Sequence, residues 1–118
     1  MESGYKGLRA YEVSYSLAIQ LYEISKRLPR EEIYGITSQL RRASLSVPLN
    51  IAEGYGRKAN PRDYRQFLYV AKGSSNEVQV LLDFIRDLGY VSEEEHDALY
   101  SQYDEVQKLL FGIIRNIE

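Results

Sequence analysis

Apolar residues recur at spacings of three and four along several segments of the chain, and this periodicity limits its fold more than any other feature. Such spacings place side chains on one face of an α-helix, whereas a half-buried strand needs strict alternation, which no segment shows. We therefore expect an all-α protein with helices near residues 8–28, 38–55, 61–88 and 92–117. In the first segment the apolar series is Val13, Leu17, Leu21, Ile24 and Leu28.

Residues that start helices stand between these segments. Asn60 can cap a helix whose first position is Pro61, and Ser92 with Glu95 forms a capping box. The connections after residues 55 and 88 are short, which favours antiparallel neighbours. The expected architecture is a single domain, residues 1–118, folded as an up-down-up-down four-helix bundle.

The second segment has a proline in its interior. Pro48 has no backbone N–H, so the carbonyl of Ser44 loses its helical partner, and we expect a kink there. Thr37 or Ser38 is the expected N-cap of this helix.

Four polar residues lie among apolar neighbours on the second and third segments: Asn50, Glu53, Asn76 and Glu77. If these two helices pair antiparallel, the four side chains meet. A small-molecule or ion site is one interpretation. A hydrogen-bonded network that fixes helix register is the interpretation we favour, because buried polar groups are normally paired for structural reasons.

Tyrosine is unusually frequent, with eleven in the chain and no tryptophan. Tyr11, Tyr15 and Tyr22 form a second stripe on the first helix, and we expect them at an oligomer interface, where tyrosine combines large contact area with a polar tip. Other tyrosines lie near basic residues, a mixture that single-strand binders use, so base stacking is an open alternative.

Charge is unevenly distributed although the net charge is only −2. Residues 35–65 hold six basic and two acidic side chains, and residues 86–118 hold three basic and eight acidic ones. The basic flank is either a site for weak contact with RNA or DNA or simply a solvated surface of mixed charge. Its members are Arg41, Arg42, Arg57, Lys58, Arg62 and Arg65.

The residues for common catalytic and metal sites are missing. The chain has no cysteine, which excludes a disulfide framework, a thiolate zinc site and a cysteine nucleophile. Its single histidine, His96, belongs to one Glu-x-x-His motif, whereas di-iron bundles need two motifs and two further glutamates. We expect no enzyme activity, no metal, no cofactor and no small-molecule substrate. No apolar run approaches the roughly 20 residues that span a bilayer, so we expect a cytoplasmic protein without membrane contact.

The stretch from Gln39 to Arg57, QLRRASLSVPLNIAEGYGR, resembles the signature of the four-helix bundle proteins encoded in 23S rRNA intervening sequences. Further matches are Tyr34-Gly35, the DYRQFL run from Asp63, the GSSNE run from Gly73 and the LGY run from Leu88. Where the family often has an early tryptophan, this chain has Tyr11.

The resemblance implies a bundle that assembles as a homopentameric ring and has no established catalytic activity. It also implies kinship with the accessory protein of diversity-generating retroelements, a basic pentamer that binds nucleic acid and a reverse transcriptase. This chain is acidic overall, unlike that branch. The leading hypothesis is therefore a self-assembling, non-enzymatic protein, and the alternative is a nucleic-acid-binding accessory factor.

Overall fold

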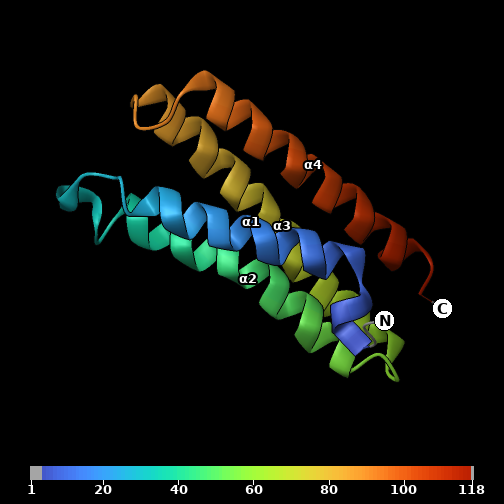
Figure 1. The fold of residues 1–118 in the computed structure, drawn as a ribbon. Helices are drawn as coiled ribbons and strands as arrows, with labels where there is room; N and C mark the ends of the chain where they lie inside the picture. Colours follow the sequence, from blue (N-terminus) through green and yellow to red (C-terminus); the bar gives the residue numbers. More distant parts are fainter. Residues whose placement is uncertain (1–3, 118) are drawn as a thin grey trace.

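The computed structural model describes residues 4–117 and consists of four packed helices (Figure 1). Short 3-10 helices, η1 (Gly4–Gly7) and η2 (Arg30–Glu32), precede the first and second of them. No strand occurs within residues 4–117. The expected all-α four-helix bundle is confirmed. The helices are α1 (Arg9–Ser25), α2 (Ile36–Gly56), α3 (Pro61–Asp87) and α4 (Glu93–Arg115).

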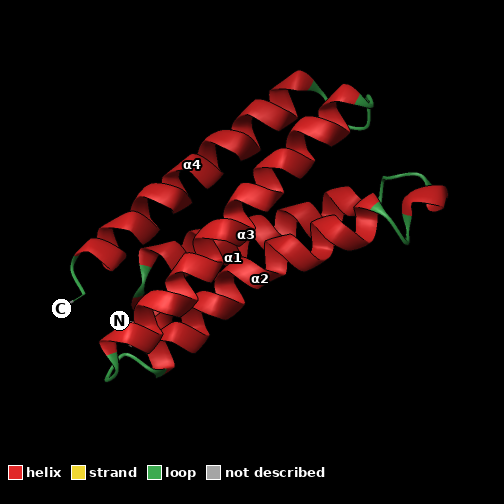
Figure 2. Ribbon diagram, turned by 180° about the vertical axis from the view of Figure 1, so that it is seen from behind, coloured by secondary structure: helices red, strands yellow, loops and turns green. Residues whose placement is uncertain are grey.

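Successive helices alternate in direction and pack as the pairs α1–α2, α2–α3, α3–α4 and α1–α4. One end of the bundle holds η1, the α2–α3 connection and the end of α4, and the other holds the α1–α2 and α3–α4 connections (Figures 1 and 2). None of the helices described for residues 4–117 combines the length and the hydropathy needed to cross a membrane.

The core is built from one apolar stripe on each helix, as the spacing predicts. Twelve large side chains are almost completely buried, and burying one Leu, Ile or Val side chain contributes about 1.5–3 kcal/mol. They are Leu17, Leu21, Leu40, Val47, Ile51, Leu68, Val78, Leu82, Ile85, Tyr103, Val106 and Leu110.

Two helix starts are as the sequence predicts. The side chain of Asn60 accepts a hydrogen bond from the backbone N–H of Asp63 at 3.2 Å. The hydroxyl of Ser92 accepts from the N–H of Glu95, and the Glu95 carboxylate accepts from the N–H of Ser92, at 3.0 and 3.2 Å. Each cap satisfies backbone donors that have no partner within the helix.

Three boundaries differ from the prediction by two residues or more, and one of them is the end of α4, which lies at Arg115 and not at residue 117. α1 ends at Ser25, not at residue 28, although Leu28 is still buried in the core. α2 begins at Ile36 with Gly35 as its N-cap, and no side chain caps it. The predicted cap at Thr37 or Ser38 is wrong because Thr37 is already helical and lies buried in the interior.

Pro48 is buried inside α2, which continues through it as one helix. The kink predicted there is not confirmed. Close by, the Asn50 amide donates to the carbonyl and the hydroxyl of Ser46, at 2.8 and 2.9 Å. The Ser46 hydroxyl also lies 2.9 Å from that of Ser74, so a polar contact links α2 to α3 within the apolar seam.

Gly54 lets α2 and α3 approach closely near the end of α2. A Cβ added at this position would lie 2.9 Å from the Cβ of Phe67 and 3.3 Å from the ring of Tyr64. The Cβ of Phe67 is fixed by the backbone of α3, and the Tyr64 ring is packed in the core, so neither yields easily. The close packing of α2 against α3 therefore requires glycine at position 54, where the side chain is a single hydrogen atom.

We expect Gly54→Ala to lower the free energy of unfolding by about 1–3 kcal/mol through overpacking. Gly112→Ala is the matched control, because Gly112 is also helical but a methyl group added there would meet nothing within 4 Å. That control should stabilise the protein by up to about 1 kcal/mol, since alanine has the higher helix propensity. Urea denaturation measures both changes, and equal effects would contradict this account of Gly54.

His96 joins α3 to the first turns of α4. Its side chain is 6 % exposed, with Nε2 2.7 Å from Asp83 Oδ1 and Nδ1 2.8 Å from Asp97 Oδ1. Arg86 of α3 lies 3.4 Å from the same Nε2, and the ring of Tyr100 is 5.3 Å away. A protonated imidazole donates to both carboxylates.

Burial lowers the pKa of His96, and the positive charge of Arg86 acts in the same direction. The hydrogen bonds to Asp97 and Asp83 outweigh these effects and raise the pKa above 6.5, the ordinary value for histidine. A pKa that is higher in the folded than in the unfolded state stabilises the protein fully below the unfolded value. That stabilisation is lost as the pH rises through the folded value.

We therefore expect the free energy of unfolding to fall as the pH rises above about 6.5, and to fall less in His96→Gln. Because His96 is the only histidine, the difference between the two profiles isolates its contribution. Urea denaturation from about pH 5 to about pH 9 measures it, and parallel profiles would show that His96 is not held as a cation.

Candidate functional site

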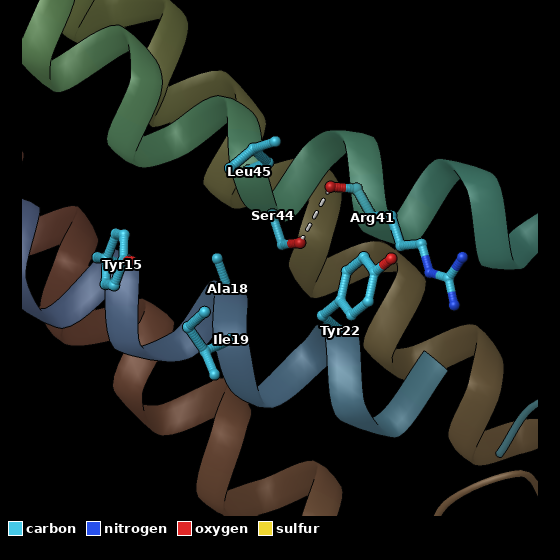
Figure 3. A pocket seen from close by; sticks show the side chains of 7 residues that line it. All are labelled: Tyr15, Ala18, Ile19, Tyr22, Arg41, Ser44 and Leu45. Carbon is cyan, nitrogen blue, oxygen red and sulfur yellow. Dashed lines mark hydrogen bonds between the residues drawn. The ribbon is translucent and has the colours of Figure 1, made fainter. Parts of the chain in front are cut away.

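A shallow apolar hollow of about 140 Å³ lies between α1 and α2 (Figure 3). We call it the α1–α2 groove. Nearly all of its surface is carbon, and a single charged side chain reaches it from the residues described. It is lined by Tyr15, Ala18, Ile19, Tyr22, Arg41, Ser44 and Leu45.

The groove exists because α1 carries more apolar surface than the core can cover. One stripe of α1 is buried, and a second remains outside, with Tyr15, Ile19 and Tyr22 each about half exposed. The small side chains of Ala18 and Ser44 are buried beneath them and leave the hollow. A helix with two apolar stripes faces its own core on one side and has an unpartnered face on the other.

α2 supplies the opposite wall. Leu45 is 51 % exposed, and Leu49, one turn later on the same face, is 57 % exposed. Sequence reasoning missed these leucines and Ile19. The signal was available in their spacing of four, off the core stripe of each helix.

The three tyrosines predicted for an interface do not share one environment. Tyr15 and Tyr22 line the groove. Tyr11 is half-buried, with its ring 4.9 Å from that of Tyr5 and 5.8 Å from that of Tyr15. Burial raises the pKa of the Tyr11 phenol. Tyr11 therefore packs against the chain's own first turn and lies beside the groove.

Arg41 borders the groove. Its Nε donates to the hydroxyl of Ser25 at 2.7 Å, and its guanidinium lies 4.4 Å from the ring centroid of Tyr22 (Figure 3). No carboxylate within residues 4–117 forms an ion pair with it. Arg41 thus places an uncompensated positive charge at the edge of an apolar surface.

The predicted polar network is not formed, because its four members point in different directions. Asn50 bonds within α2, and Glu53 is exposed and pairs with Arg57 at 3.1 Å. Glu77 pairs with Arg42, and Asn76 accepts from Gln107 of α4. The prediction failed because α3 turns its residues 76 and 77 toward different neighbours, about 100° apart. None of the four is buried.

The predicted basic flank is divided between two parts of the bundle. Arg41 and Arg42 lie near the start of α2, whereas Arg57, Lys58, Arg62 and Arg65 follow its end or begin α3. About 15 residues of helix, roughly 22 Å, separate Arg42 from Arg57. They do not form one surface.

The second group has additional basic neighbours that sequence spacing did not reveal, because helix ends distant in sequence meet there. η1, the start of α1 and the end of α4 bring Lys6, Arg9 and Arg115 to this end of the bundle (Figure 1). The Arg65 guanidinium donates to the carbonyl of Ile117, which joins α3 to the segment after α4. We call these seven side chains the basic end: Lys6, Arg9, Arg57, Lys58, Arg62, Arg65 and Arg115.

Some of the positive charge of the basic end is neutralised by nearby carboxylates. Among residues 4–117, the carboxylates of Glu12, Glu53, Asp63 and Glu105 lie near these cations, and Glu105 lines a surface hollow with Arg9 and Glu12. Arg9 forms an ion pair with Glu12 at 3.0 Å, and Arg57 forms one with Glu53 at 3.1 Å. Arg57 also lies over the ring of Phe67. Across residues 4–117, the other five cations of the basic end form no ion pair.

Acidic and histidine side chains do not converge on a common point in the described part of the chain. Within residues 4–117, no group of three or more His, Asp or Glu side chains is arranged to hold a metal ion. His96 has both ring nitrogens engaged by carboxylates.

Comparison with known proteins gives a consistent relationship. A solved structure of a protein with unknown function from the S23 ribosomal protein family of Bacteroides thetaiotaomicron shares the fold, with a TM-score of 0.82 and 23% identity over 91% of this chain and 96% of that chain. No curated protein matches the chain. The family model described as 23S rRNA-intervening sequence protein matches residues 6–112. The chain therefore belongs to the family of 23S rRNA-intervening sequence proteins.

Proposed function

We propose that this protein is a non-enzymatic, self-assembling four-helix bundle that works in the cytoplasm as a homopentamer. The observation that carries the proposal is the α1–α2 groove, an apolar hollow that the protein's own chain leaves open. Two features support it: the chemistry of the groove and the family to which the chain belongs.

The groove has the composition of a protein–protein contact. Contiguous exposed apolar patches on soluble proteins commonly mark interaction sites. Two tyrosines and an arginine border this one, and Tyr and Arg are enriched among the residues that contribute most to binding. Arg41 would regain a charged partner if an acidic side chain covered it.

The number of copies has a different basis. No feature of the single chain gives the number of copies. The number five comes only from the resemblance of residues 39–57 to the family signature. The absence of catalysis is supported by His96, the most obvious candidate acid or base, which is held between two carboxylates. The family description names no reaction.

We expect sedimentation equilibrium of the wild type at micromolar concentration to give about five times the protomer mass. Leu45→Asp should weaken each contact by about 2 kcal/mol or more, because it removes apolar surface from the groove, and its carboxylate, four residues after Arg41, would pair with Arg41 in place of a partner's acidic side chain. The variant should then be mainly monomeric. Leu45 is half exposed, so the substitution should leave the fold intact.

Phe111→Asp is the matched control. Phe111 is 55 % exposed on α4, outside the groove, and its replacement should leave assembly unchanged. A wild type that remains monomeric would end the proposal. Equal loss of assembly in both variants would show that the groove has no special role.

The basic end favours a second function, contact with single-stranded nucleic acid, as in the accessory proteins of diversity-generating retroelements. Among residues 4–117, seven cations gather there against four carboxylates, and a ring would repeat them around one rim. Binding of this kind comes from neutralising phosphates and releasing counterions. Multivalency would strengthen contacts that are weak in one copy.

We expect weak, sequence-independent binding to single-stranded RNA at low salt. The logarithm of affinity should fall with the logarithm of salt by roughly 0.7 per phosphate contact. Fluorescence anisotropy across a salt series measures it. The variant Lys58→Glu, Arg62→Glu should abolish binding, and the equally charged Lys26→Glu, Arg30→Glu at the opposite end should not. Equal loss of RNA binding in both double variants would show a general effect of charge and would contradict a binding site at the basic end.

A further inference from the structure

A second exposed apolar surface runs along α3. Val80, Phe84 and Leu88 follow one another at spacings of four and therefore form one ridge. Their exposed fractions are 66 %, 52 % and 47 %. We call them the α3 ridge. None of them lines the α1–α2 groove, so the protein presents two separate apolar surfaces on different helices.

A ring needs two such surfaces. When a surface binds its own copy about a two-fold axis, assembly stops at a dimer, whereas closed rings of more copies are built from two different surfaces that bind head to tail. The pentamer proposed above therefore requires a partner surface for the groove. That partner must be convex, apolar and exposed.

The dimensions of the groove favour an aromatic side chain. Its volume is about 140 Å³, close to the roughly 150 Å³ of an engineered apolar cavity that binds benzene. Three phenylalanine or tyrosine side chains on α3 and α4 are exposed enough to enter it: Tyr69, Phe84 and Phe111. Charge distinguishes among them.

The groove carries the positive charge of Arg41, so the side chain that enters it should have acidic neighbours. Phe84 has Asp83 and Asp87 beside it, and Glu77 lies one turn before Val80. Arg86 contacts both aspartates, Asp83 also pairs with His96, and Glu77 pairs with Arg42. Asp87 is the most exposed of these carboxylates, with 68 % of its side chain accessible.

The other two aromatic side chains have basic neighbours. Phe111 lies under the guanidinium of Arg115, 5.8 Å from its ring centroid, and Lys108 precedes it by one turn. Tyr69 stands between Arg65 and Lys72 along the face of α3. Docking either of them would bring these cations toward Arg41.

We propose that Phe84 of one copy inserts into the α1–α2 groove of the next, with Val80 and Leu88 covering its rim and Asp87 approaching Arg41. This head-to-tail contact rests on the proposed self-assembly and names the two surfaces that form it. Burying two separate apolar surfaces in one repeated interface leaves neither exposed in the closed ring, which is the outcome that hydrophobic burial favours.

Complementation of two assembly-deficient variants tests the pairing. Leu45→Asp blocks the groove and keeps the ridge; Phe84→Asp blocks the ridge and keeps the groove. Each variant alone should be monomeric in sedimentation velocity. Mixed at equal concentration they should form a species of two copies, because one intact groove and one intact ridge remain between them. The double variant, which carries both Leu45→Asp and Phe84→Asp in one chain, should stay monomeric.

The wild type is run alongside, so a monomeric wild type would defeat self-assembly itself and this contact with it. If the wild type assembles and Phe84→Asp assembles equally well, the pairing is wrong while self-assembly stands. Failure of the mixture to form dimers, although each partner is folded by circular dichroism, would also overturn the pairing. Phe84→Gln gives the same comparison if the aspartate variant does not fold, and Phe111→Asp should assemble as the wild type does.

Discussion

Burial of four apolar stripes in one shared core is the interaction on which the rest of this structure depends. Each helix contributes side chains such as Leu21, Ile51, Leu82 and Leu110 that lose almost all contact with water. Most of the stability of a helix in a protein comes from packing its apolar face against other elements. Close approach then matters at particular points, and Gly54 allows it where α2 meets α3.

The same constraint explains what is left outside. A bundle can bury one stripe per helix, but α1, α2 and α3 carry further apolar residues outside that stripe. The surplus appears as the α1–α2 groove and the α3 ridge, which lie on different helices and differ in shape and in neighbouring charge. Under the proposed self-assembly, another copy covers the apolar surface that one core cannot cover, so that assembly continues what folding begins.

Polar contacts have a different role in this protein. They join neighbouring helices one pair at a time: His96 with Asp83 between α4 and α3, Arg42 with Glu77 between α2 and α3. Most are partly exposed, so each contributes modestly to stability. Their value lies in setting the register of helices whose apolar faces would tolerate sliding. A single polar network through the bundle, as expected from Asn50 and Glu53, is not needed for that.

Local sequence determined the secondary structure and most of the core. Periodicity predicted four helices, and short-range chemistry at Asn60 and Ser92 predicted where two of them start, because both depend on residues a few positions apart. The tyrosine stripe on α1 was also visible, and Tyr15 and Tyr22 do line the groove.

Tertiary structure decided everything that joins distant segments. Leu45 completes the groove only because α2 lies against α1, and the cations of the basic end meet only because the helix ends do. The predicted polar network failed because helix packing gave its members other partners: Asn76 bonds to Gln107 of α4, and Glu77 pairs with Arg42 of α2. Spacing along a chain fixes which residues share a face of one helix, but the rotation and partners of that face are set by packing against the others.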